Sequence, residues 1–276
     1  MRCARFLLSS ILIAASIGVR ADDDAQVQRG LIDAQVARLA TEPEAGSRVF
    51  FLGFAGYGDE RVFAEEIKLA AARVGEKYGS AGRTVLLLND RRDLSTYPLA
   101  SESSLRYSLQ ALARVMNLEA DVLFLALSSH GSPDATIDVS NTGMTPQPLS
   151  ADRLASLLEE SGIRWRVIVV SACFSGRFVN PLADSHTIVI TAAAKNRTSF
   201  GCSDKRDLTY FGEAFYRDAL PYSTYLRGAF EAARKDIRQR ERDEDFTPSQ
   251  PQAYFGPLME EKLRGIERAR AMPSHR

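Results

Sequence analysis

The 276-residue chain has little of several residue types: three cysteines, three histidines and one tryptophan. Beyond an apolar run near the N-terminus, no hydrophobic segment is longer than a strand, which excludes a membrane-spanning helix in the rest of the chain. Basic and acidic residues balance at 35 each, so the charge gives no reason to expect nucleic acid as a partner. The motif Gly-x-Ser-x-Gly is missing, which argues against an α/β-hydrolase with a serine nucleophile.

The N-terminus has the features of a secretory signal peptide. Arg2 and Arg5 precede an apolar run over residues 6–19, and the small residue Ala21 follows just before three aspartates. The run is shorter than the roughly 20 residues that cross a bilayer, so a signal anchor is the weaker alternative. We expect residues 1–21 to be removed and the protein to be exported to the periplasm or the extracellular space, without a membrane anchor.

Removal of the signal peptide would leave two cysteines, Cys173 and Cys202. Two cysteines in an oxidising compartment pair by default, so a structural disulfide is one interpretation of them. The same cleavage removes three arginines and no acidic residue, which leaves a slight negative net charge.

Strand-length apolar runs alternate with segments of helical periodicity along the rest of the chain. This alternation predicts one α/β domain, with a mostly parallel sheet covered by helices on both faces. The strand segments are nearly continuous runs of Val, Ile, Leu and Phe, as expected of strands that are buried on both faces. The predicted strands are Arg48–Phe54, Thr84–Asn89, Asp121–Ser128, Trp165–Ser171 and Thr187–Thr191.

Apolar residues at helical spacing predict helices between these strands and after them. A hairpin-like piece, Thr136–Val139, interrupts the alternation, and the prolines in residues 247–252 predict a loop. The basic face of the helix near residues 223–242 is interpreted as solvated surface. The helical segments are Glu60–Tyr78, the regions around Leu105–Met116 and Leu154–Leu158, Tyr210–Leu220, Ser223–Arg242 and a segment after Gly256.

Two neighbouring predicted strands run directly into chemically reactive side chains. The strand that ends at Ser128 leads to His130, and the strand that ends at Ser171 leads to Cys173. Ligands bind at the carboxyl edge of a parallel sheet, so an imidazole and a thiol at these positions would share one edge.

A thiol and an imidazole at one edge suit attack on a peptide bond. A cysteine attacks a carbonyl carbon as the thiolate, and an imidazole supports that state and then protonates the leaving amine. Gly131 has no side chain, so its N–H can approach the substrate and hold the oxyanion together with the N–H of Cys173. This chemistry requires no metal and no cofactor, and its substrates are peptides or proteins.

Simpler interpretations exist for each residue. A histidine at a strand end is often a turn residue, and a cysteine there is often a small buried apolar group. The glycines at 53, 56 and 58 could cradle a phosphate, although their spacing is not that of the dinucleotide fingerprint. A catalytically silent peptide-binding scaffold of the same fold is the main alternative to an enzyme. The joint occurrence of His-Gly and Ala-Cys after successive strands favours the enzyme.

The His-Gly and Ala-Cys blocks together resemble the caspase-like clan of cysteine peptidases. The stretches 191–203, 208–213 and 248–252 narrow the resemblance to bacterial members of the legumain-type family, over about 48–256. The resemblance implies a caspase-like three-layer sandwich and endopeptidase activity through a thioester acyl-enzyme. It also implies cleavage after particular P1 residues, commonly Asn with Asp as a further candidate, and in some members peptide ligation or transamidation.

Residue by residue, the resemblance assigns His130 and Cys173 to the catalytic dyad and Gly131 to the oxyanion glycine. No aspartate is placed by sequence to orient His130, although Asp59 and Asp138 are candidates, so we predict a dyad rather than a triad.

The resemblance also assigns residues to the P1 pocket. Arg61 falls near the pocket arginine, Ser199 on a pocket serine and Glu213 at an acidic position. Ser171 stands where legumains carry an acidic residue, and the apolar Val62 follows Arg61; both departures weaken an Asn preference. An exposed helix residue is the alternative interpretation of Arg61.

Cys202 also matches a family position, which favours a packing role over a bond to Cys173. The resemblance and the N-terminal pattern together predict four parts of the chain. They are a signal peptide (1–21), a pro-segment or surface helix (22–47), a peptidase domain (48–256) and a C-terminal helix and tail (257–276).

Overall fold

The computed structural model describes residues 24–42, 46–141, 145–202 and 206–271. The expected signal peptide lies outside the described residues, so its removal stays a prediction. Within the described part of the chain, no helix is both long enough and apolar enough to cross a membrane.

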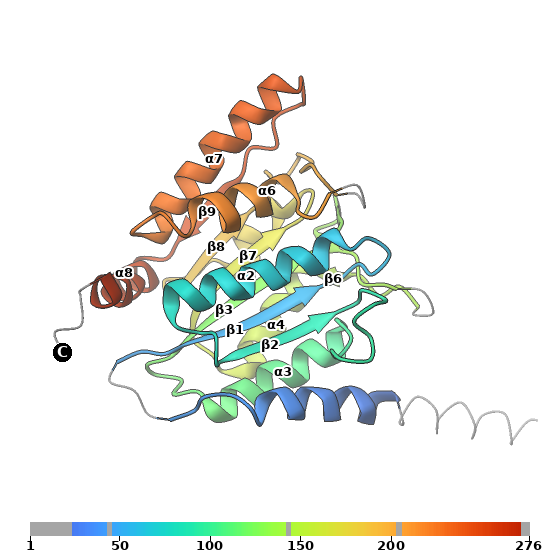
Figure 1. The fold of residues 1–276 in the computed structure, drawn as a ribbon, viewed down its shortest axis with the longest axis vertical. Helices are drawn as coiled ribbons and strands as arrows, with labels where there is room; N and C mark the ends of the chain where they lie inside the picture. The colour runs from blue at the N-terminus through green and yellow to red at the C-terminus, as the bar shows by residue number, and fades with distance from the viewer. Residues whose placement is uncertain (1–23, 43–45, 142–144, 203–205, 272–276) are drawn as a thin grey trace, which may run out of the picture.

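A six-stranded sheet with the strand order β2-β1-β3-β7-β8-β9 forms the centre of the fold (Figure 1). The first five strands in this order run parallel, and β9 pairs antiparallel with β8 at one edge. The sequence predicted every parallel strand to within one residue at each end. The strands are β1 Val49–Ala55, β2 Thr84–Leu88, β3 Val122–Ser128, β7 Trp165–Ser171, β8 Thr187–Thr191 and β9 Gln252–Phe255.

Helices cover both faces of the sheet, so the predicted three-layer sandwich is confirmed. The alternation of side chains along β1 shows how two separate cores arise: Phe51 belongs to one core, whereas Phe50 and Leu52 belong to the other. Burying each such side chain contributes about 1.5–3 kcal/mol. On the face of Phe51 lie α2 Val62–Tyr78, η2 Glu213–Ala219, α7 Leu226–Asp243 and α8 Pro257–Ala271; on the other lie α3 Glu102–Val115 and α4 Ala151–Ser161.

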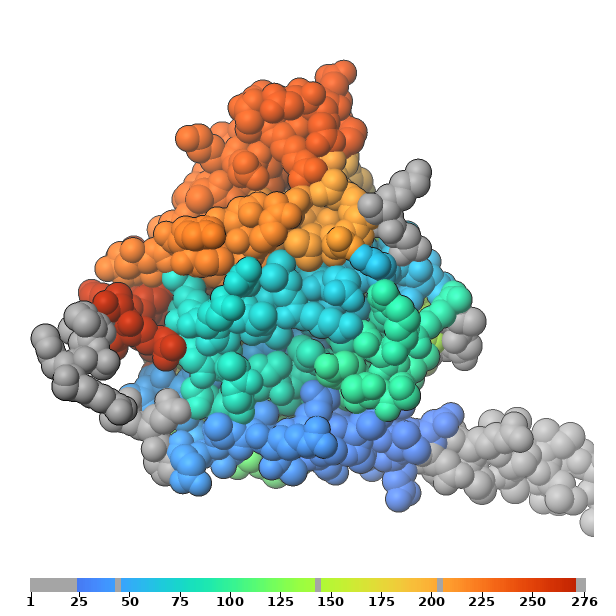
Figure 2. Space-filling model, in the orientation of Figure 1, coloured from blue at the N-terminus to red at the C-terminus, as the bar shows by residue number. Residues whose placement is uncertain are grey.

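A helix over residues 24–36 closes the α3 side of the molecule, along the lower edge of the view in Figure 2. Ile32 of this helix is fully buried in the core of that face. The side-chain amide of Gln35 accepts from the backbone N–H of Leu86 at 2.9 Å and donates to its carbonyl oxygen at 3.0 Å. Because β2 is an edge strand, this amide covers part of an otherwise open sheet edge.

A small antiparallel sheet follows β3 and shapes the segment that carries His130. It consists of β4 Gly131–Ser132, β5 Thr136–Ile137 and β6 Leu149–Ser150. The hairpin-like segment predicted at Thr136–Val139 therefore supplies the middle strand of this sheet.

Candidate active site

The register of the central sheet brings the His130 and Cys173 segments to the same place. Ser128 at the end of β3 pairs with Ser171 at the end of β7. The N–H of Ser129 then donates to the carbonyl oxygen of Ser171 at 3.2 Å. His130 and Cys173 each lie two residues beyond the paired serines, so both leave the carboxyl edge of the sheet side by side.

Gly131 marks the closest approach of the two segments. A Cβ atom at this position would lie 2.2 Å from the carbonyl oxygen of Cys173 and 3.1 Å from the Cβ of Ala172. Any residue other than glycine would therefore push the two backbones apart.

The pairing of β4 with β5 also fixes the direction of the Gly131 N–H. The N–H of Asp138 donates to the carbonyl oxygen of His130 at 3.0 Å, so these two residues form a hydrogen-bonded pair. Hydrogen-bonded and non-hydrogen-bonded pairs alternate along an antiparallel ladder, which makes Gly131 and Ile137 a non-hydrogen-bonded pair. The N–H of Gly131 is thus left outside the ladder, as an oxyanion donor must be.

The imidazole of His130 is held by one carboxylate and two aromatic rings. Glu60 Oε2 lies 3.0 Å from Nε2, and the histidine side chain is 33% exposed. The rings of Tyr57 and Phe63 stand edge-on to the imidazole, with centroids 4.7 and 4.9 Å away. These contacts fix the plane of the ring.

Sequence reasoning missed Glu60. It named Asp59 and Asp138 as candidates to orient the histidine, but Asp59 contacts Arg91 instead. The available signal was the position of Glu60 at the start of the predicted helix after β1, since β1 is the neighbour of β3.

The thiol of Cys173 contacts a loop that follows β8. The backbone N–H of Ser199 donates to Sγ at 3.3 Å, and the Ser199 hydroxyl oxygen lies 3.7 Å from it. Phe174, the next residue, adopts a left-handed conformation with φ of 55° and donates its N–H to the carbonyl oxygen of Arg197 at 2.7 Å. A left-handed non-glycine residue is strained, and such strain is common at functional sites.

Cys173 and Cys202 are both free, so the structure contains no disulfide between them. Burial, followed by the nearby Cys173, raises the pKa of the Cys202 thiol to about 12. Cys202 packs against the core on the α2 face. Cys202 therefore has a packing role and is not bonded to Cys173.

The predicted pocket residues divide into two groups. Ser199 contacts the thiol, and Ser171 is buried with its hydroxyl 3.4 Å from that of Thr209. Arg61 lies at the N-terminal end of α2, where it forms an ion pair with the exposed Asp207. Asp207, the partner of Arg61, lies two residues before Thr209, the neighbour of Ser171. Arg61 and Ser171 therefore border the same region.

Glu213 lies instead in a cluster of arginines. Its carboxylate pairs with Arg206, Arg217 and Arg240. Burial alone would raise the pKa of Glu213, but the hydrogen bonds and charges of Arg240 and Arg217 lower it overall. The cluster neutralises the acidic group that sequence reasoning assigned to the pocket.

The glycines at 53, 56 and 58 serve close packing in this structure. The N–H of Gly56 donates to the carbonyl oxygen of Ser128, and the N–H of Gly58 donates to that of Ser140. A Cβ atom at Gly58 would lie 1.9 Å from the carbonyl oxygen of Asn89. Because the main chain already uses these donors, the segment cannot cradle a phosphate.

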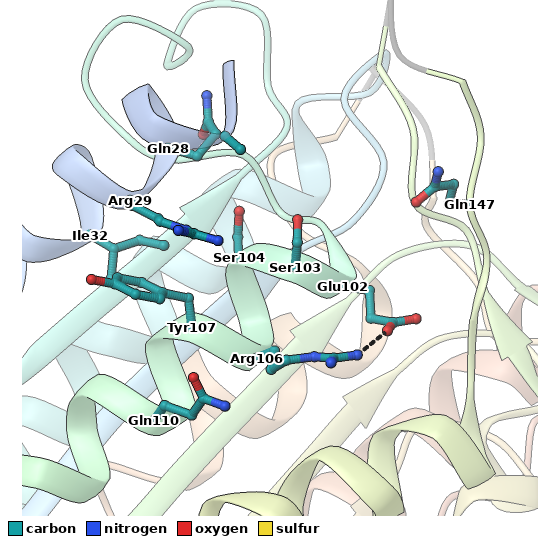
Figure 3. Close-up of a pocket in the computed structure, with 11 residues that line it drawn as sticks. Gln28, Arg29, Ile32, Glu102, Ser103, Ser104, Arg106, Tyr107, Gln110 and Gln147 are labelled. Carbon is teal, nitrogen blue, oxygen red and sulfur yellow. Dashed lines mark hydrogen bonds and ion pairs between the residues drawn. The ribbon is translucent and has the colours of Figure 1, made fainter. Parts of the chain in front are cut away.

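A separate cavity of about 420 Å³ lies between the helix over residues 24–36 and α3 (Figure 3). Figure 3 shows Arg106 pointing at Glu102, with which it forms an ion pair of 2.9 Å. Gln28 of the helix over residues 24–36 and Tyr107 of α3 both line this cavity. Neither the His130 segment nor the Cys173 segment lines it.

Comparison with known proteins agrees with this geometry. Residues 106–261 match the family described as the peptidase C13 family, and this range contains both His130 and Cys173. No curated protein sequence gives a significant match. The crystal structure of caspase-1 from Spodoptera frugiperda is similar, with a TM-score of 0.52 and 10% sequence identity over 76% of this chain and 87% of that chain. At this identity the similarity concerns the fold alone.

Proposed function

The chain belongs to the peptidase C13 family, and on this premise we propose that it is a cysteine endopeptidase with Cys173 as nucleophile and His130 as its acid–base partner. One observation carries the proposal: the His-Gly segment after β3 and the Ala-Cys segment after β7 touch at the carboxyl edge of the sheet. This contact meets the requirement that a nucleophile and its base share one edge.

The contacts of the two side chains support distinct roles. Glu60 engages Nε2 of His130, so Nδ1 is the nitrogen left to exchange a proton with the thiol. The N–H of Ser199 donates to Sγ at 3.3 Å, and Sγ lies 3.6 Å from the carbonyl oxygen of the same residue, so Ser199 holds the sulfur in place.

In the proposed reaction, the Cys173 thiolate attacks the carbonyl carbon of the scissile peptide bond, and a C–S bond forms. The N–H groups of Gly131 and Cys173 hold the resulting oxyanion. His130 donates its proton to the departing amine as the C–N bond breaks, which leaves a thioester on Cys173. Water then attacks the thioester, gives a proton to His130 and releases the acid product with the thiolate restored. An amine in place of water would give ligation by the same route.

For the P1 pocket we propose Ser171, Ser199 and Arg61 as lining residues. Glu213 is left out of this proposal, because its carboxylate pairs with Arg206, Arg217 and Arg240. Hydroxyl groups near the thiol suit a polar P1 side chain such as Asn or Asp, because each hydroxyl both donates and accepts hydrogen bonds.

Labelling with a thiol-directed peptide probe tests the proposal. We expect one adduct on Cys173 that is abolished in Cys173→Ala, slowed in His130→Ala and unchanged in the matched control Cys202→Ala. Equal labelling of Cys173→Ala, or peptide binding without any modification of the wild type, would instead indicate a silent binding scaffold.

We also propose that the protein is exported after removal of residues 1–21. Expression in a host with a secretory pathway should yield a chain whose first residue is Asp22 outside the cytoplasm. Recovery of the intact Met1 chain in the cytoplasm would contradict this proposal.

A further inference from the structure

A carboxyl group lies fully buried directly beneath the candidate site. Glu66 of α2 is 0% exposed. The hydroxyl of Thr209 donates a hydrogen bond to its Oε2 atom. The same Thr209 side chain accepts from the N–H of Gly212 at 2.9 Å and so caps α6, Tyr210–Gly212. A Cβ atom at Gly212 would lie 2.3 Å from Oε2, which shows how closely α6 packs on the carboxyl.

The serines that end β3 and β7 face the same carboxyl. Both serines are buried, and the hydroxyl of Ser171 lies 3.4 Å from the hydroxyl of Thr209 that donates to Glu66. Glu66 Oε1 and the hydroxyl oxygen of Ser128 are completely enclosed, and neither has a hydrogen-bond partner in the described part of the chain. Each is therefore the available partner of the other.

We propose that Glu66 is a positioning residue of the peptidase site: its carboxyl binds Thr209, which contacts Ser171, and it pairs with the enclosed hydroxyl of Ser128, and so bridges and fixes the two strand ends from which His130 and Cys173 project. The inference rests on the proposed function, and it adds a residue that touches neither substrate nor the reacting atoms.

The surroundings favour a neutral carboxyl at this position. Burial raises the pKa of Glu66, and the nearby hydroxyls of Ser171, Thr209 and Ser128 offset this only in part. The ionisable groups that face it are Tyr216 of η2 and Cys202 of the loop after β8. Among the described residues, no basic side chain forms an ion pair with it. A neutral carboxyl can donate one hydrogen bond and accept others, so it can pair with these hydroxyls without placing a charge in the buried site.

Two substitutions at Glu66 distinguish the effect of its hydrogen bonds from the effect of its buried bulk. Glu66→Gln keeps the shape, one donating group and one acceptor, whereas Glu66→Leu keeps only the bulk. The matched controls are Glu267→Gln and Glu267→Leu, because Glu267 is also a buried carboxyl, bonded to Tyr78 at 2.8 Å. Tyr78 lies twelve residues beyond Glu66 on α2, or about 18 Å away at the usual helical rise.

We expect Glu66→Leu to lower kcat on the order of 10- to 100-fold with little change in KM, because small displacements of catalytic groups act on the chemical step. Glu66→Gln should regain most of the lost kcat, and Glu267→Leu should keep kcat even if it unfolds at a lower temperature. Equal kcat in Glu66→Leu and Glu267→Leu, or no rescue by glutamine, would overturn the proposal. If Glu66→Leu does not fold, Ser128→Ala and Thr209→Val remove one bridge partner each, and wild-type kcat in both would overturn it.

The pH profile gives a readout that a purely structural role would not move. Ionisation of Glu66 would place an unpaired charge in the buried site, so the wild type should lose kcat at high pH relative to Glu66→Gln, which cannot ionise. Stability should follow the same sign: the folded pKa lies above the ordinary value of 4.5, so the stability of the neutral form is fully present below about pH 4.5 and is lost as pH rises through the folded pKa. The melting temperature of Glu66→Gln should therefore gain on the wild type as pH increases. A constant difference between the two would contradict a titrating Glu66.

Alkylation of Cys173 by iodoacetamide keeps the two proposals distinguishable. A wild-type protein that cleaves no peptide would refute the proposed function alone. The pH midpoint of Cys173 alkylation would still decide the role of Glu66, since it reports the thiolate without any peptide substrate. We expect Glu66→Leu to raise this midpoint and Glu66→Gln to restore it; an unchanged midpoint in Glu66→Leu would overturn the inference.

Discussion

Among the described residues, the backbone donor that contacts the thiol of Cys173 is the N–H of Ser199, at 3.3 Å. We predict that Ser199→Pro, which removes this N–H, slows alkylation of Cys173 near neutral pH, because the thiolate loses a hydrogen bond worth about 1.5–3 kcal/mol. Ser199→Ala is the matched control, since it removes only the hydroxyl and keeps the N–H. Iodoacetamide labelling followed by mass spectrometry measures both variants. Equal rates in the two variants would show that the backbone donor is unimportant.

The carboxylate of Glu60 contacts the second side chain of the proposed dyad, His130. We predict that Glu60→Gln lowers kcat by roughly 10- to 100-fold, because the protonated imidazole loses the negative charge 3.0 Å from Nε2. KM should change little, since Glu60 contacts the histidine rather than the thiol loop. Asp59→Asn, at the neighbouring position, is the control and should retain activity. Comparable losses in both variants would point to a general effect of charge rather than to the contact with His130.

The positions in the fold that sequence can predict are those that follow from a strand end. His130, Gly131 and Cys173 come directly after β3 and β7, and parallel register then brings them together. Glu60 and Glu66 could not be found in this way, because their contacts depend on how α2 lies against the ends of two strands. Glu213 matched a family position, yet arginines from three separate places in the sequence surround it.

At the scale of elements, the strands that the sequence predicts are those that are buried along their length. β3 is buried along its whole length and appears in the sequence as one continuous apolar run. β9 is an edge strand whose residues are exposed or half-exposed, and Pro251 precedes it, so its sequence resembles a loop. The strands β4 to β6 have two residues each, too few for any periodicity. Tertiary pairing alone defines these short elements.

The arginine cluster around Glu213 joins η2 to α7, and its stability should depend on pH. Because the folded pKa of Glu213 is lowered, its contribution is present above the ordinary value of 4.5 and is lost as pH falls through the folded pKa. We predict that Glu213→Gln melts below the wild type at pH 7 and that the difference shrinks in acid. Melting curves from pH 7 to about 3 measure this. Glu231→Gln, in an exposed pair with Arg234, serves as the control and should show a small effect throughout. A difference that persists at low pH would contradict an ionic origin.

At the scale of the whole molecule, the helix over residues 24–36 is part of the folded body. Ile32 fills the core under α3, and Gln35 covers the edge of β2. A pro-segment that is removed on activation would leave both places open. The surface helix, rather than a removable segment, is the arrangement that these contacts favour.

Truncating Ile32 tests this arrangement. We predict that Ile32→Ala lowers the free energy of unfolding by about 2–5 kcal/mol, as expected for a large-to-small change in a core. Val27→Ala on the same helix is the matched control, because Val27 is 58% exposed and should cost little. Urea unfolding of the two variants gives the comparison. Equal stability of Ile32→Ala and Val27→Ala would indicate that the helix detaches from the domain.

The central claim is that the two segments at the carboxyl edge of the sheet form a working peptidase site, with the thiol at 173 as nucleophile. The most direct measurement is the intact mass of the protein after acid quench of a reaction with a susceptible peptide. The account predicts a thioester on Cys173 whose added mass equals the N-terminal fragment of the peptide minus one water, absent in Cys173→Ala and reduced in His130→Ala. Peptide cleavage that proceeds unchanged in Cys173→Ala would contradict it.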